Sequence, residues 1–149
     1  MHDRPETCTA VTLTAVLFFA TVLNSAAQDT VVNTVAKGGM SSIEEPRQVV
    51  VRTAAEWQAL WKQHDGDSAA PRVDFTQSMV AAVFLGSRPT TGFAADITGV
   101  KTEGNRTVVE YLERQPPRDA IVAQVLTSPF HIVRIARTAG SVEFRRLSK

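Results

Sequence analysis

Few side chains in this sequence are of the types that carry acid–base or metal chemistry, and they do not form a recognisable motif. Two histidines, His64 and His131, lie after Ala27. The sequence from His64 to Asp67 begins like a calcium-binding loop, but the further acidic residues and the closing glutamate are missing. A histidine near a helix end is also favoured by the helix dipole alone. The sequence therefore predicts no metal site and no cofactor.

A serine, a histidine and an aspartate that could form a hydrolytic triad are present at Ser128, His131 and Asp74. Ser128 lacks the flanking glycines of a nucleophile elbow, and three such residues occur by chance in almost any domain. His131 follows Phe130 in an apolar run, where its ring can simply fill space in a core. No glycine-rich loop opens a predicted helix, so a phosphate-binding site is not indicated either. We therefore expect a protein that is not an enzyme.

Charge and cysteine content exclude other classes of function. The chain has 16 Lys and Arg against 15 Asp and Glu, and the basic residues are spread along it. Nucleic-acid-binding proteins gather basic residues on one face, so no nucleic-acid partner is predicted. The single cysteine, Cys8, lies in the N-terminal stretch. The rest of the chain can therefore form no disulfide and use no thiolate.

The N-terminal segment 1–27 has the pattern of a secretory signal peptide. Arg4 lies in a short polar stretch, and the segment 10–23 that follows carries no charge. Small residues precede Gln28, as a signal peptidase requires. The uncharged run is shorter than the roughly 20 residues of a membrane-spanning helix. We expect cleavage near Ala27 and a secreted or periplasmic protein without a stable membrane anchor; an uncleaved N-terminal anchor is the alternative.

The elements that would position a site are mostly short strands. Thr53 and Glu56 have the spacing of a capping box, and Trp57 and Trp61 recur at helical spacing, which predicts an amphipathic helix over 54–63. Runs of β-branched or alternating apolar residues predict strands at 48–52, 79–85, 93–100, 107–112, 129–135 and 142–145.

Two apolar runs have particular meaning for the fold. The run 79–85 is apolar on both pleat faces, so we expect a central strand that is covered on both sides. Residues 121–126 form another short apolar run. Residues 28–46 are expected to form a short first strand or ordered tail and a linker, and 47–149 a β-rich domain. The fold class is α+β, mostly β: a small antiparallel β-sandwich or half-open barrel of six to eight short strands with one helix packed on it.

Between the runs 79–85 and 93–100 lies the best candidate contact surface. Pro89 fixes φ, and Gly92 can adopt a positive φ, so this stretch is expected to be a rigid turn between two strands. It is either a hairpin loop with a structural role or a stiff, projecting wedge in which Thr90 and Thr91 offer hydroxyl groups to a partner. The candidate partner-binding residues are Arg88, Pro89, Thr90, Thr91, Gly92 and Phe93, with Ser128, Pro129, Phe130 and His131 of a second corner.

With these residues the chain resembles the PrcB C-terminal domain family, whose type member is an accessory subunit of an exported protease complex. The resemblance implies a small, mostly β, non-catalytic domain that stabilises or associates with a protease. Phe93 stands where family members more often have tyrosine. The likeness covers about 47–144 and rests on Ala55-Glu56-Trp57-Gln58-Ala59-Leu60-Trp61, Val73-Asp74-Phe75, Phe84-Leu85-Gly86-Ser87-Arg88-Pro89-Thr90-Thr91-Gly92-Phe93, Pro116-Pro117 and Leu126-Thr127-Ser128-Pro129-Phe130-His131-Ile132-Val133.

The stretch Arg88-Pro89-Thr90-Thr91-Gly92-Phe93 is also similar to the central loop motif of chagasin-type cysteine protease inhibitors, Asn-Pro-Thr-Thr-Gly followed by an aromatic residue. Those inhibitors are immunoglobulin-like sandwiches that insert this loop into the enzyme cleft. Here Arg88 replaces the asparagine, and the other two loop motifs have no convincing match. The first hypothesis is therefore an exported, non-catalytic protein-binding module whose partner is an exported protease or another envelope protein. The alternative is a direct peptidase inhibitor that acts through Pro89 to Phe93.

Overall fold

The computed structural model describes residues 28–29 and 32–148, and the predicted signal peptide lies outside this part of the chain. Within the described residues no helix is long and apolar enough to cross a membrane. The elements are, in chain order, β1 (Gln28–Asp29), β2 (Asn33–Gly38), β3 (Arg47–Val51), α1 (Ala54–His64), β4 (Ser78–Phe84), β5 (Ala94–Glu103), β6 (Arg106–Arg114), β7 (Phe130–Ala136) and β8 (Ser141–Arg146).

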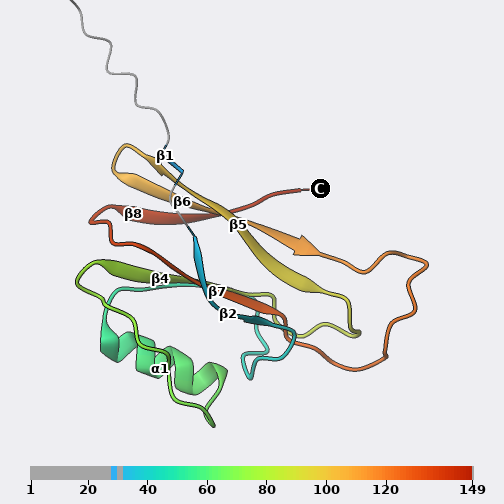
Figure 1. Ribbon diagram of the computed structural model, residues 1–149. Helices are drawn as coiled ribbons and strands as arrows, with labels where there is room; N and C mark the ends of the chain where they lie inside the picture. The colour runs from blue at the N-terminus through green and yellow to red at the C-terminus, as the bar shows by residue number, and fades with distance from the viewer. Residues whose placement is uncertain (1–27, 30–31, 149) are drawn as a thin grey trace, which may run out of the picture.

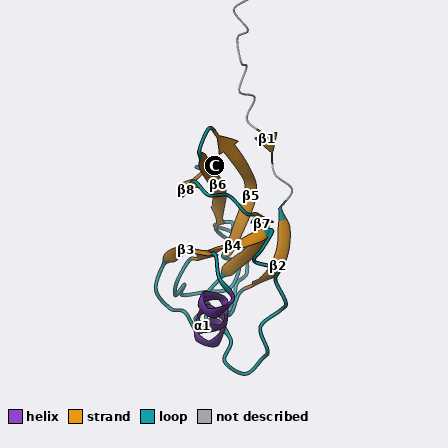
Figure 2. Ribbon diagram, turned by 90° about the vertical axis from the view of Figure 1, so that its left-hand side faces the viewer, coloured by secondary structure: helices purple, strands orange, loops and turns teal. Residues whose placement is uncertain are grey.

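The strands form two four-stranded sheets that pack face to face. Sheet A has the order β1-β5-β6-β8 and sheet B the order β2-β7-β4-β3. In Figure 1 sheet A lies above sheet B and α1 lies below sheet B, and Figure 2 shows the same three layers after a quarter turn. The mostly β sandwich with one helix is therefore confirmed. One pairing departs from the antiparallel expectation, because β6 and β8 are parallel.

The central strand is covered on both faces, as its composition predicts. Met79, Ala81 and Val83 of β4 lie in the core between the two sheets. Val80 and Phe84 point the other way, into a second core between sheet B and α1. Side chains alternate along a strand, so one apolar run serves two cores. Both faces of β4 are therefore buried.

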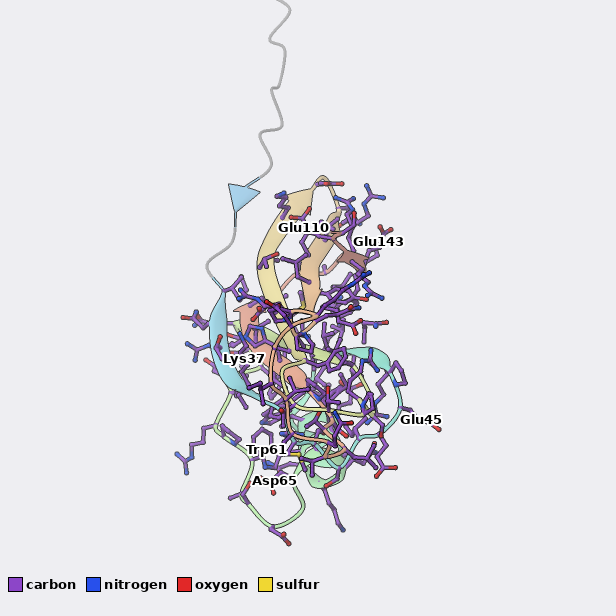
Figure 3. The ribbon with its side chains drawn as sticks, turned by 90° about the vertical axis from the view of Figure 1, so that its right-hand side faces the viewer. Lys37, Glu45, Trp61, Asp65, Glu110 and Glu143 are labelled. Atoms are coloured by element: carbon purple, nitrogen blue, oxygen red, sulfur yellow. The ribbon has the colours of Figure 1, made fainter. Side chains whose placement is uncertain are left out.

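Helix α1 begins at the predicted capping box. The Glu56 backbone N–H donates to Thr53 Oγ1 at 3.3 Å, and the Thr53 N–H donates back to Glu56 Oε2 at 3.2 Å. Trp57 and Trp61, both buried, face sheet B. In Figure 3 Trp61 lies at the helix end of the molecule, far from Glu110 and Glu143 of sheet A.

The connection between β4 and β5 is not the hairpin loop that its turn residues suggest. Strand β4 belongs to sheet B and β5 to sheet A, and they do not pair with each other. Strand β5 instead forms its hairpin with β6 through Gly104, whose φ is +62°. Residues 86–93 therefore carry the chain from one sheet to the other. A local turn signal cannot distinguish these two arrangements, because both need the same turn residues.

Candidate functional site

The two candidate segments, 88–93 and 128–131, lie side by side. Arg88 and Thr127 form an isolated antiparallel bridge, in which the Arg88 N–H donates to Thr127 O at 2.7 Å and the Thr127 N–H donates to Arg88 O at 2.9 Å. The Leu85 N–H donates to Pro129 O at 2.9 Å. These bonds extend the β4–β7 pairing beyond the ends of both strands. We call the end of the molecule formed by 86–93 and 115–129 the loop end; it lies on the right of Figure 1.

The threonine hydroxyls of the candidate turn bond within the protein. Thr91 Oγ1 accepts a hydrogen bond from the Ala123 N–H at 3.0 Å, and the Thr91 N–H donates to Ala123 O at 3.1 Å. Thr90 Oγ1 donates to Thr91 O at 3.1 Å, and Thr127 Oγ1 donates to Thr90 O at 2.9 Å. Of the two hydroxyl groups that the wedge interpretation offers to a partner, that of Thr91 fastens the turn to the neighbouring loop and that of Thr90 bonds within the turn.

Two glycines allow the close approach of these loops. Gly92 has a φ of +92°, as predicted, and a Cβ built there would lie 2.7 Å from Pro116 Cβ. Gly86 has a φ of +75°, and its Cβ would lie 2.7 Å from Glu44 O and from the Pro46 ring. Any other residue would be strained by its backbone and would collide with a neighbour. The turn is therefore held firmly against its neighbours.

Arg88 holds the turn from its other side. Its Nη2 lies 2.9 Å from Glu113 Oε1, and its guanidinium carbon lies 5.9 Å from the centre of the Phe93 ring. Arg146 Nη2 contacts the second oxygen of Glu113 at 2.8 Å. The Glu113 side chain is 7% exposed, so one largely buried carboxylate is shared by two arginines. Arg88 thus links the turn to β6, and through Glu113 to β8.

The second corner is buried and supports the turn from beneath. The ring of Phe130 lies 4.1 Å from that of His64 and is stacked on that of Phe84, centre to centre 6.3 Å. The structure thus brings both predicted segments together but exposes only the turn. Pro89 and Gly92 are exposed, whereas Arg88, Thr90, Thr91 and Phe93 are half-buried and Ser128, Pro129, Phe130 and His131 are buried.

His131 lies between the two sheets. The backbone N–H of Ile97 donates to His131 Nδ1 at 2.8 Å, and His131 Nε2 lies 2.9 Å from Thr34 Oγ1. An N–H donor opposite Nδ1 requires the neutral ring with its proton on Nε2. Burial lowers the pKa of His131, and the positive charge of Lys37 lowers it further, while Asp96 raises it. The His131 ring is therefore neutral, and it connects the two sheets.

The structure does not assemble the hydrolytic triad that can be written from the sequence. Both ring nitrogens of His131 bond residues other than Ser128 and Asp74. Asp74 Oδ1 instead accepts hydrogen bonds from the N–H and the hydroxyl of Thr76, at 2.9 and 2.5 Å. Among the described residues, no cluster of three or more His, Cys, Asp or Glu side chains could hold a metal ion.

Exposed apolar side chains gather at the loop end, and the sequence reasoning did not single them out. In the described part of the chain, the exposed large apolar residues are Met40, Ile121, Val125 and Leu126, and Leu126 is 70% exposed. Three of them lie in the apolar run 121–126, which forms no strand. Met40 follows Gly39, whose carbonyl accepts a hydrogen bond from the Ser128 N–H at 2.8 Å. The apolar run was visible in the sequence, but its exposure was not.

Comparison with known families supports the resemblance drawn from the motifs. Residues 79–136 match the family described as PrcB C-terminal. This segment extends from β4 through β7 and contains both the turn and the buried corner. The predicted family likeness is therefore confirmed over these elements. Comparisons with curated proteins and with solved structures gave no match.

Proposed function

We propose that this protein is an exported, non-catalytic binding module that associates with a protease through its loop end. The PrcB C-terminal match supports a role beside a protease, and the matched residues include the turn that forms part of this surface. The partner would be a protein of the same exported compartment, since the segment 1–27 has the pattern of a signal peptide. Catalysis would belong to the partner.

The observation that carries this proposal is the position of the exposed apolar side chains. Met40, Val125 and Leu126 are each more than half exposed, on segments that are hydrogen-bonded to one another or to the turn. Exposed large apolar residues that gather on one surface are typical of sites that bind another protein. Covering such side chains contributes about 25 cal/mol for each Å² of apolar surface removed from water.

Rigidity of the loop end supports the same role. Backbone bonds join Arg88 to Thr127 and Thr91 to Ala123, and Gly92 is packed against Pro116. A surface that is ordered before binding loses less conformational entropy when a partner docks. The loop end therefore has the properties of a pre-formed interface.

A direct inhibitor remains the second candidate, because Pro89 and Gly92 of the inhibitor-like motif stay exposed at the turn. In this role the turn would enter the cleft of a papain-like protease. Inhibition assays against such enzymes separate the two functions. Nanomolar inhibition that Pro89→Glu abolishes, in a variant whose fold is checked by circular dichroism, would assign the inhibitor role and overturn the module as proposed.

The test of the proposed function is recovery of the exported protease with the tagged protein from its own envelope or culture medium. The protease is expected to be recovered with the native chain and lost with Leu126→Asp, which places a charge in the apolar surface. Ala59→Asp is the matched control, because Ala59 lies on the exposed side of α1. Equal recovery with Leu126→Asp and Ala59→Asp would contradict the proposed interface. N-terminal sequencing of the exported protein tests cleavage after Ala27.

A further inference from the structure

A groove lies beside α1, at the end of β4 opposite the loop end. It has a volume of about 510 Å³ and is bordered by α1, by residues 70–75 and by Arg134 of β7. Arg134 pairs with Val80 near the start of β4, whereas the loop end begins after Phe84. The two surfaces are therefore separated along β4 by the four residue steps from Val80 to Phe84, roughly 14 Å at the usual rise of a strand.

The floor of this groove is apolar and fixed in place. Trp57 is 2% exposed, and its indole N–H donates to Pro71 O at 2.8 Å, which ties the 70–75 segment to α1. Val73 and Phe75 are half-buried beside it. The only polar atom of the Trp57 side chain is thus already bonded, so this floor is suited to an apolar side chain.

Two arginines at the groove have no partner among the residues that the structure describes. Among the described residues, only three arginines, Arg72, Arg118 and Arg134, have guanidinium groups without a hydrogen bond, an ion pair or an aromatic contact. Arg72 and Arg134 both border the groove, and both are exposed. By contrast, Arg106 on sheet A is paired with Glu103 at 2.7 Å.

The surroundings of the groove add to its positive charge. Arg137 Nη1 donates to Phe75 O at 2.6 Å and to Arg52 O at 2.9 Å, and Arg52 bonds the carbonyl oxygens of Thr138 and Gly140. Carbonyl oxygens accept these hydrogen bonds but do not neutralise the charge of Arg137, whereas the nearby Glu56 carboxylate offsets that of Arg52. The acidic side chain in the groove, Asp74, accepts two hydrogen bonds from Thr76. Positive charge therefore exceeds negative charge around the groove.

We propose that this groove binds an acidic segment of a partner protein. An apolar side chain of the segment would rest on the floor formed by Trp57, Val73 and Phe75, and neighbouring carboxylates would pair with Arg72 and Arg134. Guanidinium groups bind carboxylates through paired, charge-assisted hydrogen bonds, which suits this arrangement. The site is independent of the loop end, so the protein would hold two partners, or two parts of one partner, at opposite ends of sheet B.

The experiment uses the purified protein and a synthetic probe, acetyl-Asp-Leu-Asp-Leu-Asp-amide, with binding followed by tryptophan fluorescence and by titration calorimetry. Saturable binding that weakens as salt is added is expected, because the contacts are ionic and partly exposed. The matched probe, acetyl-Asn-Leu-Asn-Leu-Asn-amide, should bind at least about tenfold more weakly, since hydrogen bonds to charged groups are the stronger ones.

The three variants that test the site each replace one arginine by glutamine and so remove the same charge. Arg134→Gln and Arg72→Gln should each raise the dissociation constant about tenfold or more, whereas Arg118→Gln, which removes the same charge outside the groove, should leave it unchanged. All three side chains are exposed and form no bond to another described residue, so each variant is expected to fold, and circular dichroism checks this. The proposal is overturned if the acidic probe does not bind, if the amide probe binds equally well, or if Arg118→Gln weakens binding as much as Arg134→Gln.

The same assay separates this site from the proposed function. Leu126→Asp at the loop end should bind the acidic probe as the native chain does. Conversely, Arg134→Gln should still recover a protease that binds through the loop end alone. Loss of probe binding in Leu126→Asp would contradict two independent sites.

Discussion

His131 on β7 accepts a hydrogen bond from the backbone N–H of Ile97 on β5, 2.8 Å from Nδ1, and so joins the two sheets of the sandwich through one ring. The pairing of β5 with β6 shifts register between Ile97 and Gly99, which is the irregularity that lies beside this bond. The other ring nitrogen lies 2.9 Å from Thr34 Oγ1 on β2. Three strands from two sheets are therefore connected at an imidazole whose pKa burial holds below its usual value.

Stability should fall as the pH is lowered below about 6.5. Burial is the main cause that lowers the pKa of both His131 and His64. Lys37 lowers the pKa of His131 further, while Asp96 raises it. Asp65 raises the pKa of His64. Below pH 6.5 the unfolded chain binds protons on these histidines that the folded chain does not bind. The stability that comes from keeping both rings neutral is therefore fully present above pH 6.5, and it is lost as the pH falls towards the pKa values of the folded protein. Urea unfolding at pH 7.5 and 5.0 measures the effect.

The variant His131→Gln provides the comparison for that experiment, because an amide can accept the Ile97 hydrogen bond without titrating. We expect it to have a smaller difference in unfolding free energy between the two pH values than the native chain. An unfolding midpoint of the native protein that does not change over this range would contradict the prediction.

Gly92→Ala should destabilise the protein more than Gly104→Ala. Both glycines have positive φ, +92° and +62°, and an L-residue in that region costs about 1–2 kcal/mol. At Gly104 a new Cβ would meet nothing within 4 Å, whereas at Gly92 it would lie 2.7 Å from Pro116. The difference between the two unfolding free energies measures the close approach at the loop end. Equal losses would mean that the loops can move apart freely.

Removing Arg88 should cost more than removing an exposed arginine of sheet A. Arg88→Gln leaves the largely buried Glu113 with Arg146 alone, and weakening a buried charge-assisted contact costs about 1–3 kcal/mol. Arg106→Gln breaks exposed pairs with Glu103 and Glu143, for which about 1 kcal/mol or less is expected. Chemical unfolding of both variants tests the ranking, and the reverse order would contradict it.

Thr91→Val should loosen the loop that carries the exposed apolar residues. The substitution removes the oxygen that accepts the Ala123 N–H and keeps the size of the side chain. Hydrogen exchange around Ala123 is expected to become faster, because its amide loses its acceptor. Thr98→Val is the matched control, since Thr98 Oγ1 bonds Glu110 O on sheet A. Unchanged exchange at Ala123 would show that the remaining bonds hold the loop.

Much of the fold could be predicted because its signals are local. The capping box of Thr53 and Glu56 defines the start of α1 through atoms three residues apart. The apolar run of β4 predicts burial on both faces from the period of a strand alone. Each of the six strand segments predicted after residue 47 corresponds to an observed strand within a few residues. The positive φ of Gly92 follows from its place in the turn.

Other features were decided only by contacts between distant segments. The sequence placed His131 in a strand, but only the packing of β5 against β7 brings the Ile97 N–H to its ring. The hydroxyl groups of Thr90 and Thr91 read equally well as contacts for a partner. Only the folding of the 121–127 loop against the turn brings the Ala123 N–H to Thr91 Oγ1 and the Thr127 hydroxyl to Thr90 O. The crossing of the chain from β4 to β5, the parallel β8 and the exposure of 121–126 depend on which strands pair. Strand pairing is a property of the whole core, so no local pattern of residues specifies it.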